Sequence, residues 1–307
     1  MQLGLFTACL PWLTLDEVAD WAASAGYDAL EVAAWPSGGD HPHHATHLEV
    51  DGRPIDTERI WALLAEHGLT LSAVSCYENN LIGDPAERRR IHSHLKACIR
   101  AASALGVPHV GTFVGRDAAR TVSDNLREAE KLLPELVRYA DDHGVRLVIE
   151  NCPMEGWHPD GYPGNLAYSP ELWDWMFDLG LYLNYDPSHL VWLGIDPVDA
   201  LRSCLKTGRV LHVQAKDIEV DPRCLLTRYG IFGKAVTRTR PEDTGWWRYR
   251  VPGRGQLDWN RIIDTLYAGG FDGAVAVEHE DPVWGGTHTK IKKGLEIAAQ
   301  TLRPLIR

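Results

Sequence analysis

The sequence predicts an α/β protein, a (β/α)8 barrel formed by a single domain that covers residues 1–307. Short apolar segments alternate with amphipathic segments over short connections, which is typical of a parallel sheet covered by helices. Eight such units lie within 307 residues. This number favours a closed barrel over a doubly wound open sheet, which is the alternative.

Each unit has the same order: an apolar strand, a polar and aromatic loop, an amphipathic helix, and a glycine before the next strand. The run 145–149, which follows Gly144, shows the apolar character of a buried parallel strand. We expect strands near 2–7, 27–33, 70–76, 108–114, 145–150, 181–186, 209–214 and 272–278. We expect helices near 14–25, 55–67, 85–105, 122–143, 169–179, 196–205, 257–269 and 286–304.

Several residues mark the expected ends of these helices. Thr14 followed by Glu17 is typical of a capping box. Asp84, Ser169 and Asp196 each precede a proline, which indicates an N-cap before a first-turn proline. The residue that follows a helix often needs positive φ, which glycine adopts without strain. The glycines expected there are Gly26, Gly68, Gly106, Gly144, Gly180, Gly208 and Gly270.

The composition argues against several classes of protein. No apolar run approaches the roughly 20 residues of a membrane helix, and the first residues lack the features of a signal peptide. We therefore expect a cytoplasmic protein with no membrane partner. The six cysteines form no CxxC pair, which fits reduced thiols. A net charge of −11 argues against a nucleic-acid partner, because nucleic-acid binders usually present a basic face.

Two connections are longer than the others, and both follow the C-terminal ends of strands. Loops on that side of a barrel build the active site, so both are candidate walls of a substrate site. The connection 34–54 carries four histidines, for which a polar surface loop is the alternative interpretation. The insertion 217–256 carries aromatic and basic residues. These residues are His41, His43, His44 and His47 in the first, and Tyr229, Trp246, Trp247, Arg248 and Arg250 in the second.

Four late strands end in side chains that can bind a divalent cation. These are Glu150, Asp186, His212 and Glu278. Each alone would be explained as a buried polar group with a hydrogen-bond partner. On a closed barrel the strand ends converge on one rim, so we expect the four to meet and to hold one metal ion. Three carboxylates and one imidazole suit Mn²⁺, with Mg²⁺ and Co²⁺ as alternatives.

Residues near these strand ends are candidates for substrate binding. His189 and Lys216 could contact a substrate hydroxyl or oxyanion, and Asp217 could orient Lys216. Phe113, Trp157 and other mouth aromatics, among them Phe6, Trp35 and Trp247, could stack on sugar rings, or could simply pack in the core or a lid. Arg250 is a further candidate in the insertion. The amides of the stretch 253–255 could bind a phosphate, although a turn before a helix capped by Asp258 explains this stretch equally well.

These strand-end motifs resemble those of the xylose isomerase-like TIM-barrel superfamily, in its sugar isomerase and epimerase branch. The resemblance covers nearly the whole chain. It implies that Glu150, Asp186, His212 and Glu278 hold one divalent metal, that Glu150 and Glu278 also move protons, and that His189 contacts substrate. Two or four copies of the chain are also implied, and a hetero-oligomer is an alternative. The matching stretches are 149–151, 185–189, 212–217, 253–259 and 277–279.

The expected function is that of a metal-dependent sugar isomerase or epimerase that acts on a free sugar or glycoside through a metal-stabilised enediolate. The chain departs from 3-epimerases of this superfamily, which carry an arginine a few residues after the histidine of the seventh strand. This chain has Lys216 and Asp217 there, and then the insertion. It also resembles the metal-bearing subunit of C-glycoside deglycosidases. A lyase or deglycosidase acting on 3-oxo sugars and a non-catalytic sugar-binding subunit are therefore the alternatives.

Overall fold

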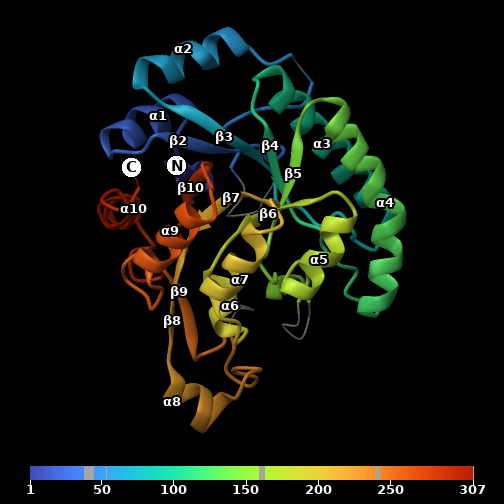
Figure 1. Ribbon diagram of the computed structural model, residues 1–307, viewed down its shortest axis with the longest axis vertical. Coiled ribbons are helices and arrows are strands. Elements are labelled where there is room, and N and C mark those ends of the chain that lie inside the picture. Colours follow the sequence, from blue (N-terminus) through green and yellow to red (C-terminus); the bar gives the residue numbers. More distant parts are fainter. Residues whose placement is uncertain (38–44, 53, 159–162, 240–242, 307) are drawn as a thin grey trace.

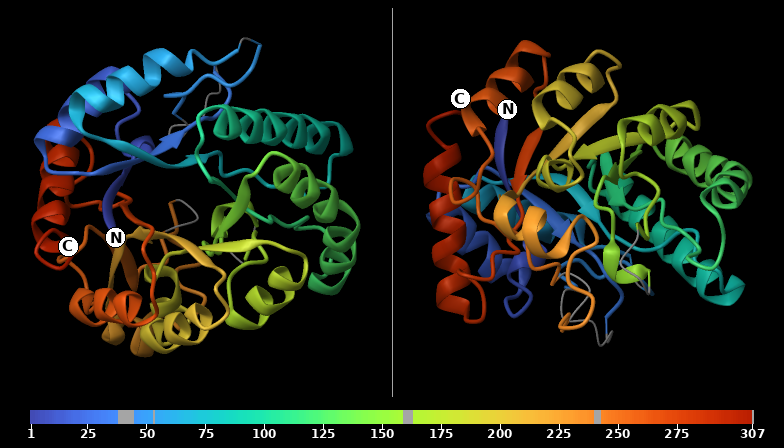
Figure 2. Two further views of the ribbon diagram at one scale, coloured as in Figure 1. Left: turned by 45° about the horizontal axis from the view of Figure 1, so that its top comes forward. Right: turned by 90° about the horizontal axis from the view of Figure 1, so that it is seen from below.

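The computed structural model contains the predicted closed barrel of eight parallel strands, surrounded by helices (Figures 1 and 2). The structure describes residues 1–37, 45–52, 54–158, 163–239 and 243–306. The strands follow one another around the barrel in chain order, and β10 closes it against β1. The eight strands are β1 (Gln2–Phe6), β2 (Ala29–Ala33), β3 (Thr70–Ser75), β4 (His109–Thr112), β5 (Arg146–Glu150), β6 (Tyr182–Tyr185), β7 (Val210–Ala215) and β10 (Ala274–Val277).

The helices lie outside the strands and pack their apolar sides against them, as amphipathic sequences require. One α-helix links each pair of neighbouring barrel strands, except that a short extra helix follows β6 directly and that the connection after β7 contains a further insertion. The helices that cover the barrel are α1 (Leu15–Ser24), α2 (Thr57–His67), α3 (Pro85–Ala104), α4 (Val122–Asp142), α5 (Pro170–Asp178), α6 (Ser188–Trp192), α7 (Pro197–Leu205), α9 (Trp259–Ala268) and α10 (His288–Leu302).

The predicted helix boundaries are confirmed at most positions. Thr14 and Glu17 form the reciprocal capping box of α1, and Asp84 and Asp196 accept amide hydrogens at the starts of α3 and α7. Ser169 occupies the N-cap of α5, but its side chain makes no capping hydrogen bond. All seven predicted glycines have positive φ; Gly68, for example, ends α2 at φ 65°.

The insertion after β7 contains an antiparallel hairpin that projects from the barrel (Figure 1). Its strands are β8 (Asp217–Val220) and β9 (Trp247–Arg250), and between them lie α8 (Pro222–Cys224) and the π-helical turn η3 (Leu225–Tyr229). The hairpin has a small core of its own, formed by Ile218, Trp246, Trp247 and Tyr249. The sequence does not predict these two strands, because they are only four residues long and lie far apart in the chain.

Asp217 anchors this hairpin to the barrel. Its buried carboxylate accepts hydrogen bonds from the amides of Ile218, Gly253, Gly255 and Leu257 at 2.8–3.1 Å. The indole of Trp259, in α9, donates a further hydrogen bond at 3.1 Å.

No helix among the described residues is long and apolar enough to cross a membrane.

Candidate active site

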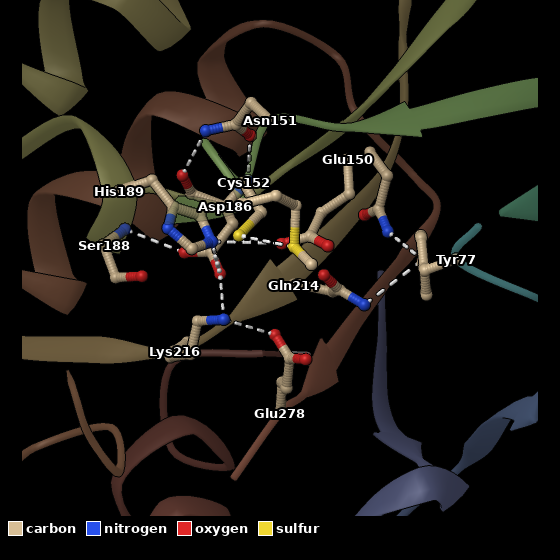
Figure 3. A network of polar contacts seen from close by, with 12 residues as sticks. Tyr77, Glu150, Asn151, Cys152, Asp186, Ser188, His189, Gln214, Lys216 and Glu278 are labelled. Atoms are coloured by element: carbon tan, nitrogen blue, oxygen red, sulfur yellow. Dashed lines mark hydrogen bonds and ion pairs between the residues drawn. The ribbon is translucent and has the colours of Figure 1, made fainter. Parts of the chain in front are cut away.

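Three carboxylates from three different strands meet at the C-terminal mouth of the barrel. Glu150 ends β5, while Asp186 and Glu278 directly follow β6 and β10. One oxygen from each lies within 4.8 Å of the others (Figure 3). Glu150 and Asp186 are buried, at 3% and 0% exposure. The predicted convergence of strand ends therefore brings these three groups together, and their role as metal ligands stays a prediction.

His212 does not join this group, which corrects the expectation of four converging residues. Its Nδ1 lies 3.0 Å from Asn184 Oδ1, and its Nε2 lies 3.0 Å from the hydroxyl of Ser72. Both ring nitrogens are thus engaged inside the barrel. Burial lowers the pKa of His212 to about 3, which keeps the ring neutral. The register explains this depth, because His212 pairs with Asn184, two residues before Asp186.

Gln214 is the residue of β7 at the height of Asp186. Side chains two residues apart on a strand share a face, so Gln214 points into the barrel above His212. Its amide nitrogen lies 3.2 Å from both Glu31 Oε2 and the hydroxyl of Tyr77. Its Oε1 is buried and has no hydrogen-bond partner among the described residues. Gln214 was missed because glutamine is rarely a metal ligand, whereas the neighbouring histidine is a common one.

Lys216 is the next inward residue of the same chain segment. It supplies a buried ammonium group to the cluster of Glu150, Asp186 and Glu278, which is called the centre below (Figure 3). Its Nζ lies 2.7 Å from Glu278, 2.9 Å from Glu280 and 3.3 Å from Asp186. Burial opposes a charge on Lys216, but the surrounding carboxylates outweigh burial and raise its pKa. The lysine is therefore a permanent cation among the acids.

His189, at the start of α6, contacts the same group of carboxylates. Its Nε2 lies 3.0 Å from Glu150 and 3.3 Å from Asp186, while its Nδ1 lies 2.8 Å from the hydroxyl of Tyr249. Burial would lower the pKa of His189, but the negative groups around it raise it. His189, the last residue of the motif 185–189, thus lies beside the carboxylates of Glu150 and Asp186.

The acids of the centre differ in how readily they lose a proton. Burial raises the pKa of Glu150 and of Glu278, and nearby cations offset only part of this effect. Burial acts on Asp186 as well, but His189 and Lys216 outweigh it and lower its pKa. Carboxyl groups held at different pKa values are suited to separate acid and base roles.

Beneath this centre lies a second polar layer that the sequence analysis did not identify. Glu31, in β2, is fully buried and accepts hydrogen bonds from Ser75 at 2.7 Å, from Tyr77 at 2.5 Å and from Gln214. Burial raises the pKa of Glu31. A glutamate in the middle of an apolar strand is the only sequence signal for this layer, and it points to a buried group that needs partners.

The cysteine nearest the centre has no ionised thiol. Cys152 lies two residues after Glu150, and its sulfur belongs to a second close group with Glu150 and His189. Burial raises the pKa of its thiol to about 12. Because metals bind the thiolate, this raised pKa disfavours Cys152 as a ligand near neutral pH.

Four of the five predicted aromatic residues form one connected cluster around Tyr77. The ring of Phe113 lies 5.0 Å from that of Tyr77, and the ring of Trp157 lies 5.3 Å from that of Phe113. Phe6 and Trp35 contact Tyr77 at 5.6 and 6.1 Å. Trp247 lies elsewhere, stacked on Trp192 at 5.0 Å. Tyr77 also bonds to Gln214, so this cluster adjoins the polar centre.

Two other candidates from the insertion are Arg250 and the amides of the stretch 253–255. Both already make ion pairs or hydrogen bonds with other residues of the protein. The guanidinium of Arg250 is bound to Asp281 at 2.9 Å and also to Glu219. The amides of Gly253 and Gly255 donate to Asp217, so they are not free to bind a phosphate. Asp217 faces these amides and not Lys216, contrary to the expected orienting role. A Cβ on Gly255 would lie 2.2 Å from Asp217 Oδ1, which explains the glycine.

Of the four histidines after β2, only His47 lies among the described residues, and its side chain does not contact the acids of the centre. The Nε2 atom of His47 lies 3.1 Å from the carbonyl of Leu13 and 3.3 Å from that of Leu10. His41, His43 and His44 lie outside the described residues. The chemistry visible at the mouth therefore comes from the late strands and the insertion.

Parallel barrels form a class of proteins whose active sites lie at the C-terminal ends of the strands. This protein has its buried acids and its lysine at that end. Residues 19–303 match the model of a family described as Xylose isomerase-like TIM barrel. The chain belongs to this family, and this confirms the resemblance identified in the sequence.

Individual relatives agree with this assignment. The chain is 28% identical to the uncharacterized protein YfiH of Bacillus subtilis, over 98% of this chain and 99% of that protein. It is 32% identical to an inosose dehydratase of Clostridium tetani, over 33% of this chain and 32% of that protein. The solved structure of an L-ribulose 3-epimerase has the same fold, with a TM-score of 0.69 and 17% identity, over 99% of this chain and 94% of that one.

Proposed function

We propose that this protein is a divalent-metal-dependent isomerase or epimerase of a free sugar, with Glu150 and Glu278 as the two proton-transfer groups. The observation that carries the proposal is the meeting of the buried Glu150 and the partly buried Glu278 with Asp186 at the strand ends. The family assignment supports it, since the fold is shared with an L-ribulose 3-epimerase. Raised pKa values at both glutamates suit groups that exchange protons near neutral pH.

The residues of the centre fit a divalent cation. Among the described residues, four carboxyl groups, including that of Glu280, lie against two basic groups, Lys216 and His189. When all six groups are charged, two negative charges are left over, which equals the charge of one such ion. Gln214 Oε1 is buried without a hydrogen-bond partner among the described residues. Asp186 Oδ2 is also buried, and its partners are the ion pairs with His189 and Lys216, each at 3.3 Å. Oxygen ligands of this kind are those that Mn²⁺ and Mg²⁺ prefer.

Glu150, Asp186 and Glu278 would hold the ion, and Gln214 Oε1 would complete the set in place of His212. A bound divalent ion supplies Lewis-acid polarisation of a substrate carbonyl. One glutamate takes the proton from the carbon next to the carbonyl. The electron pair of that C–H bond forms a C=C bond, and the π pair of the carbonyl moves to its oxygen. Lys216 stabilises the resulting negative charge. The other glutamate starts protonated and gives its proton to carbon. A proton added to the opposite face of the same carbon inverts that centre. A proton added to the former carbonyl carbon, while the neighbouring hydroxyl passes its proton to the former carbonyl oxygen, moves the carbonyl.

The phosphorylated class of substrate is disfavoured because the amides of Gly253 and Gly255 are used by Asp217. The aromatic cluster that includes Phe113 and Trp157 offers C–H-stacking surfaces for a sugar ring instead. A lyase is the second candidate, and the partial match to an inosose dehydratase favours it. In that case the same carbanion would expel a neighbouring hydroxyl or aglycone, and Lys216 would serve the same electrostatic role.

Deuterium incorporation separates these candidates. Candidate ketoses, inososes and 3-oxo glycosides are incubated with the protein and Mn²⁺ in D₂O and followed by NMR. Deuterium at the α-carbon of a rearranged sugar supports an isomerase or epimerase, whereas loss of water or of an aglycone supports a lyase. If no substrate exchanges or reacts, the catalytic proposal fails and a sugar-binding subunit becomes the better description.

Two variants test the assigned roles. Glu150→Gln and Glu278→Gln keep the size of each side chain and remove its proton-transfer capacity. Each should reduce exchange by roughly 10²–10⁴-fold, as expected for loss of a general acid or base. Glu296→Gln, on the exposed part of α10, is the matched control. Sugar binding that persists in both variants while exchange is unchanged from wild type would contradict the catalytic roles.

A further inference from the structure

Tyr249 is the residue of the insertion that reaches the catalytic centre. Its hydroxyl lies 2.8 Å from His189 Nδ1, and its ring lies 5.2 Å from the imidazole, nearly perpendicular to it. The ammonium group of Lys216 lies 4.6 Å from the centre of the same ring. Tyr249 thus touches both basic groups of the centre, although it lies outside the matching motifs in the sequence.

The hairpin holds Tyr249 in this place. Tyr249 pairs with Ile218 across β8 and β9, and Trp247, on the same face, packs against it with ring centres 4.9 Å apart. Trp247 in turn stacks on Trp192 of α6, the helix that begins at Ser188 and carries His189. The hairpin and α6 are therefore joined at two points, which gives the Tyr249 hydroxyl a defined position relative to the imidazole.

The two ends of the imidazole have different requirements. Nε2 faces Glu150 and Asp186. An ionised carboxylate only accepts hydrogen bonds, so Nε2 carries hydrogen when both of these groups are ionised. The Tyr249 hydroxyl at the other end can donate to a bare Nδ1 or accept from a protonated one. A phenol can therefore hold the ring in both of its charge states, which a carbonyl or an ammonium group could not do.

We propose that Tyr249 is a positioning residue, which fixes the imidazole of His189 and through it the carboxylate of Glu150. The effect on catalysis rests on the proposed function, whereas the effect on His189 does not. Without the hydroxyl the imidazole can tilt or turn about its χ2 angle, because only the Nε2 end is held. Glu150 then loses a fixed hydrogen-bond donor, and the orientation of the carboxylate becomes less well defined.

The first test is an NMR measurement on protein labelled with ¹⁵N-histidine. Tyr249→Phe removes the hydroxyl and keeps the ring that packs against Trp247 and Lys216. Tyr229→Phe makes the same chemical change elsewhere in the insertion and is the matched control. The ¹⁵N signals of His189, identified by their loss in His189→Gln, should shift in Tyr249→Phe and stay unchanged in Tyr229→Phe. Unchanged signals in Tyr249→Phe would overturn the proposal.

A measurement on the unaltered protein covers the case in which Tyr249→Phe does not fold. Cross-peaks between the ring protons of Tyr249 and His189 should be observed, because their ring centres lie 5.2 Å apart. Their absence would also overturn the proposal. Neither NMR result depends on knowing the substrate.

The second test uses the substrate found by deuterium incorporation. Tyr249→Phe should lower the rate of exchange about tenfold, as expected for the loss of one hydrogen bond in the transition state, with KM changed less than twofold. An equal loss in Tyr229→Phe, or a change confined to KM, would count against positioning. If wild-type protein shows the His189 signals as expected but exchanges no substrate, the proposed function is wrong and the positioning of His189 stands.

Discussion

Lys216 Nζ lies 2.7 Å from Glu278 Oε2, and this ion pair places a fixed positive charge beside one of the two proposed proton-transfer groups. The lysine is 1% exposed, so water screens the pair very little. It also reaches Glu280 and Asp186. Lys216 therefore neutralises part of the acidic centre whether or not a divalent ion is bound.

Lys216→Met should destabilise the metal-free protein by roughly 3–5 kcal/mol, because removing one partner leaves buried carboxylates unpaired. Added Mn²⁺ should recover much of this loss, since the ion supplies the missing charge. Thermal unfolding with Mn²⁺ and with EDTA measures both effects. Lys293→Met, which breaks an exposed pair with Glu296, is the control and should change stability by less than about 1 kcal/mol. A Mn²⁺ response equal to that of wild type would contradict the prediction.

Gln214→Met should weaken Mn²⁺ binding about tenfold, because it removes the unpartnered amide oxygen and preserves the size of the side chain. His212→Gln should have a smaller effect on affinity, because both ring nitrogens are occupied by Ser72 and Asn184. Electron paramagnetic resonance of free Mn²⁺ gives both dissociation constants directly. A larger loss in His212→Gln than in Gln214→Met would favour His212 as the ligand, as the motif suggested.

Asp217→Asn should lower the free energy of unfolding by about 2–4 kcal/mol, because five donors converge on this buried carboxylate and an amide cannot accept from all of them. Denaturant unfolding measures the change. Proteolysis should also cut the insertion sooner, since β8 loses its anchor. Asp221→Asn, at the N-cap of α8, is the control, with an expected cost of at most about 1 kcal/mol. Equal costs in the two variants would refute the anchoring role.

The contact between His94 and Asp51 should make stability depend on pH. Burial disfavours the charged imidazole, but the nearby sulfur of Cys98 and the hydrogen bonds to Ala34 and Asp51, both at 2.7 Å, outweigh burial and raise the pKa of His94 from 6.5 to about 9. The pKa of His94 is higher in the folded protein than in the unfolded one. The stabilisation by charged His94 is therefore fully present below pH 6.5 and is lost as the pH rises through about 9.

His94→Gln should therefore cost about 1–2 kcal/mol at pH 6 and much less at pH 10. The Asp51 carboxylate is 55% exposed, which weakens its part of the effect. Thermal unfolding of both proteins across this range gives the difference. Asp51→Asn should reproduce a fraction of the low-pH loss. A cost that is the same at pH 6 and pH 10 would show that His94 acts by packing alone.

The local chemistry of the chain was sufficient to predict the barrel. Apolar runs, capping residues such as Thr14 and Asp196, and the glycines after helices each act within a few neighbouring residues. The same reasoning placed Glu150, Asp186 and Glu278 together, because a closed barrel brings all its strand ends to one rim. The β8–β9 hairpin was missed, because its strands pair across 26 intervening residues that carry no regular pattern.

Only the tertiary structure decided which inward residue of β7 stands at the height of the acids. His212, Gln214 and Lys216 all point into the barrel, and a pattern of period two cannot distinguish their depths. The register of β6 against β7 does so, and it places His212 beside Asn184.

The same limit applies to the insertion. Its alternating residues 247–250 have one buried and one exposed face, but the sequence does not tell which face turns towards the site. The pairing of β8 with β9 directs Tyr249 to His189 and Arg250 to Asp281. The sequence thus determined the fold and three acids of the site, while strand register and long-range packing determined the neighbours that tune them.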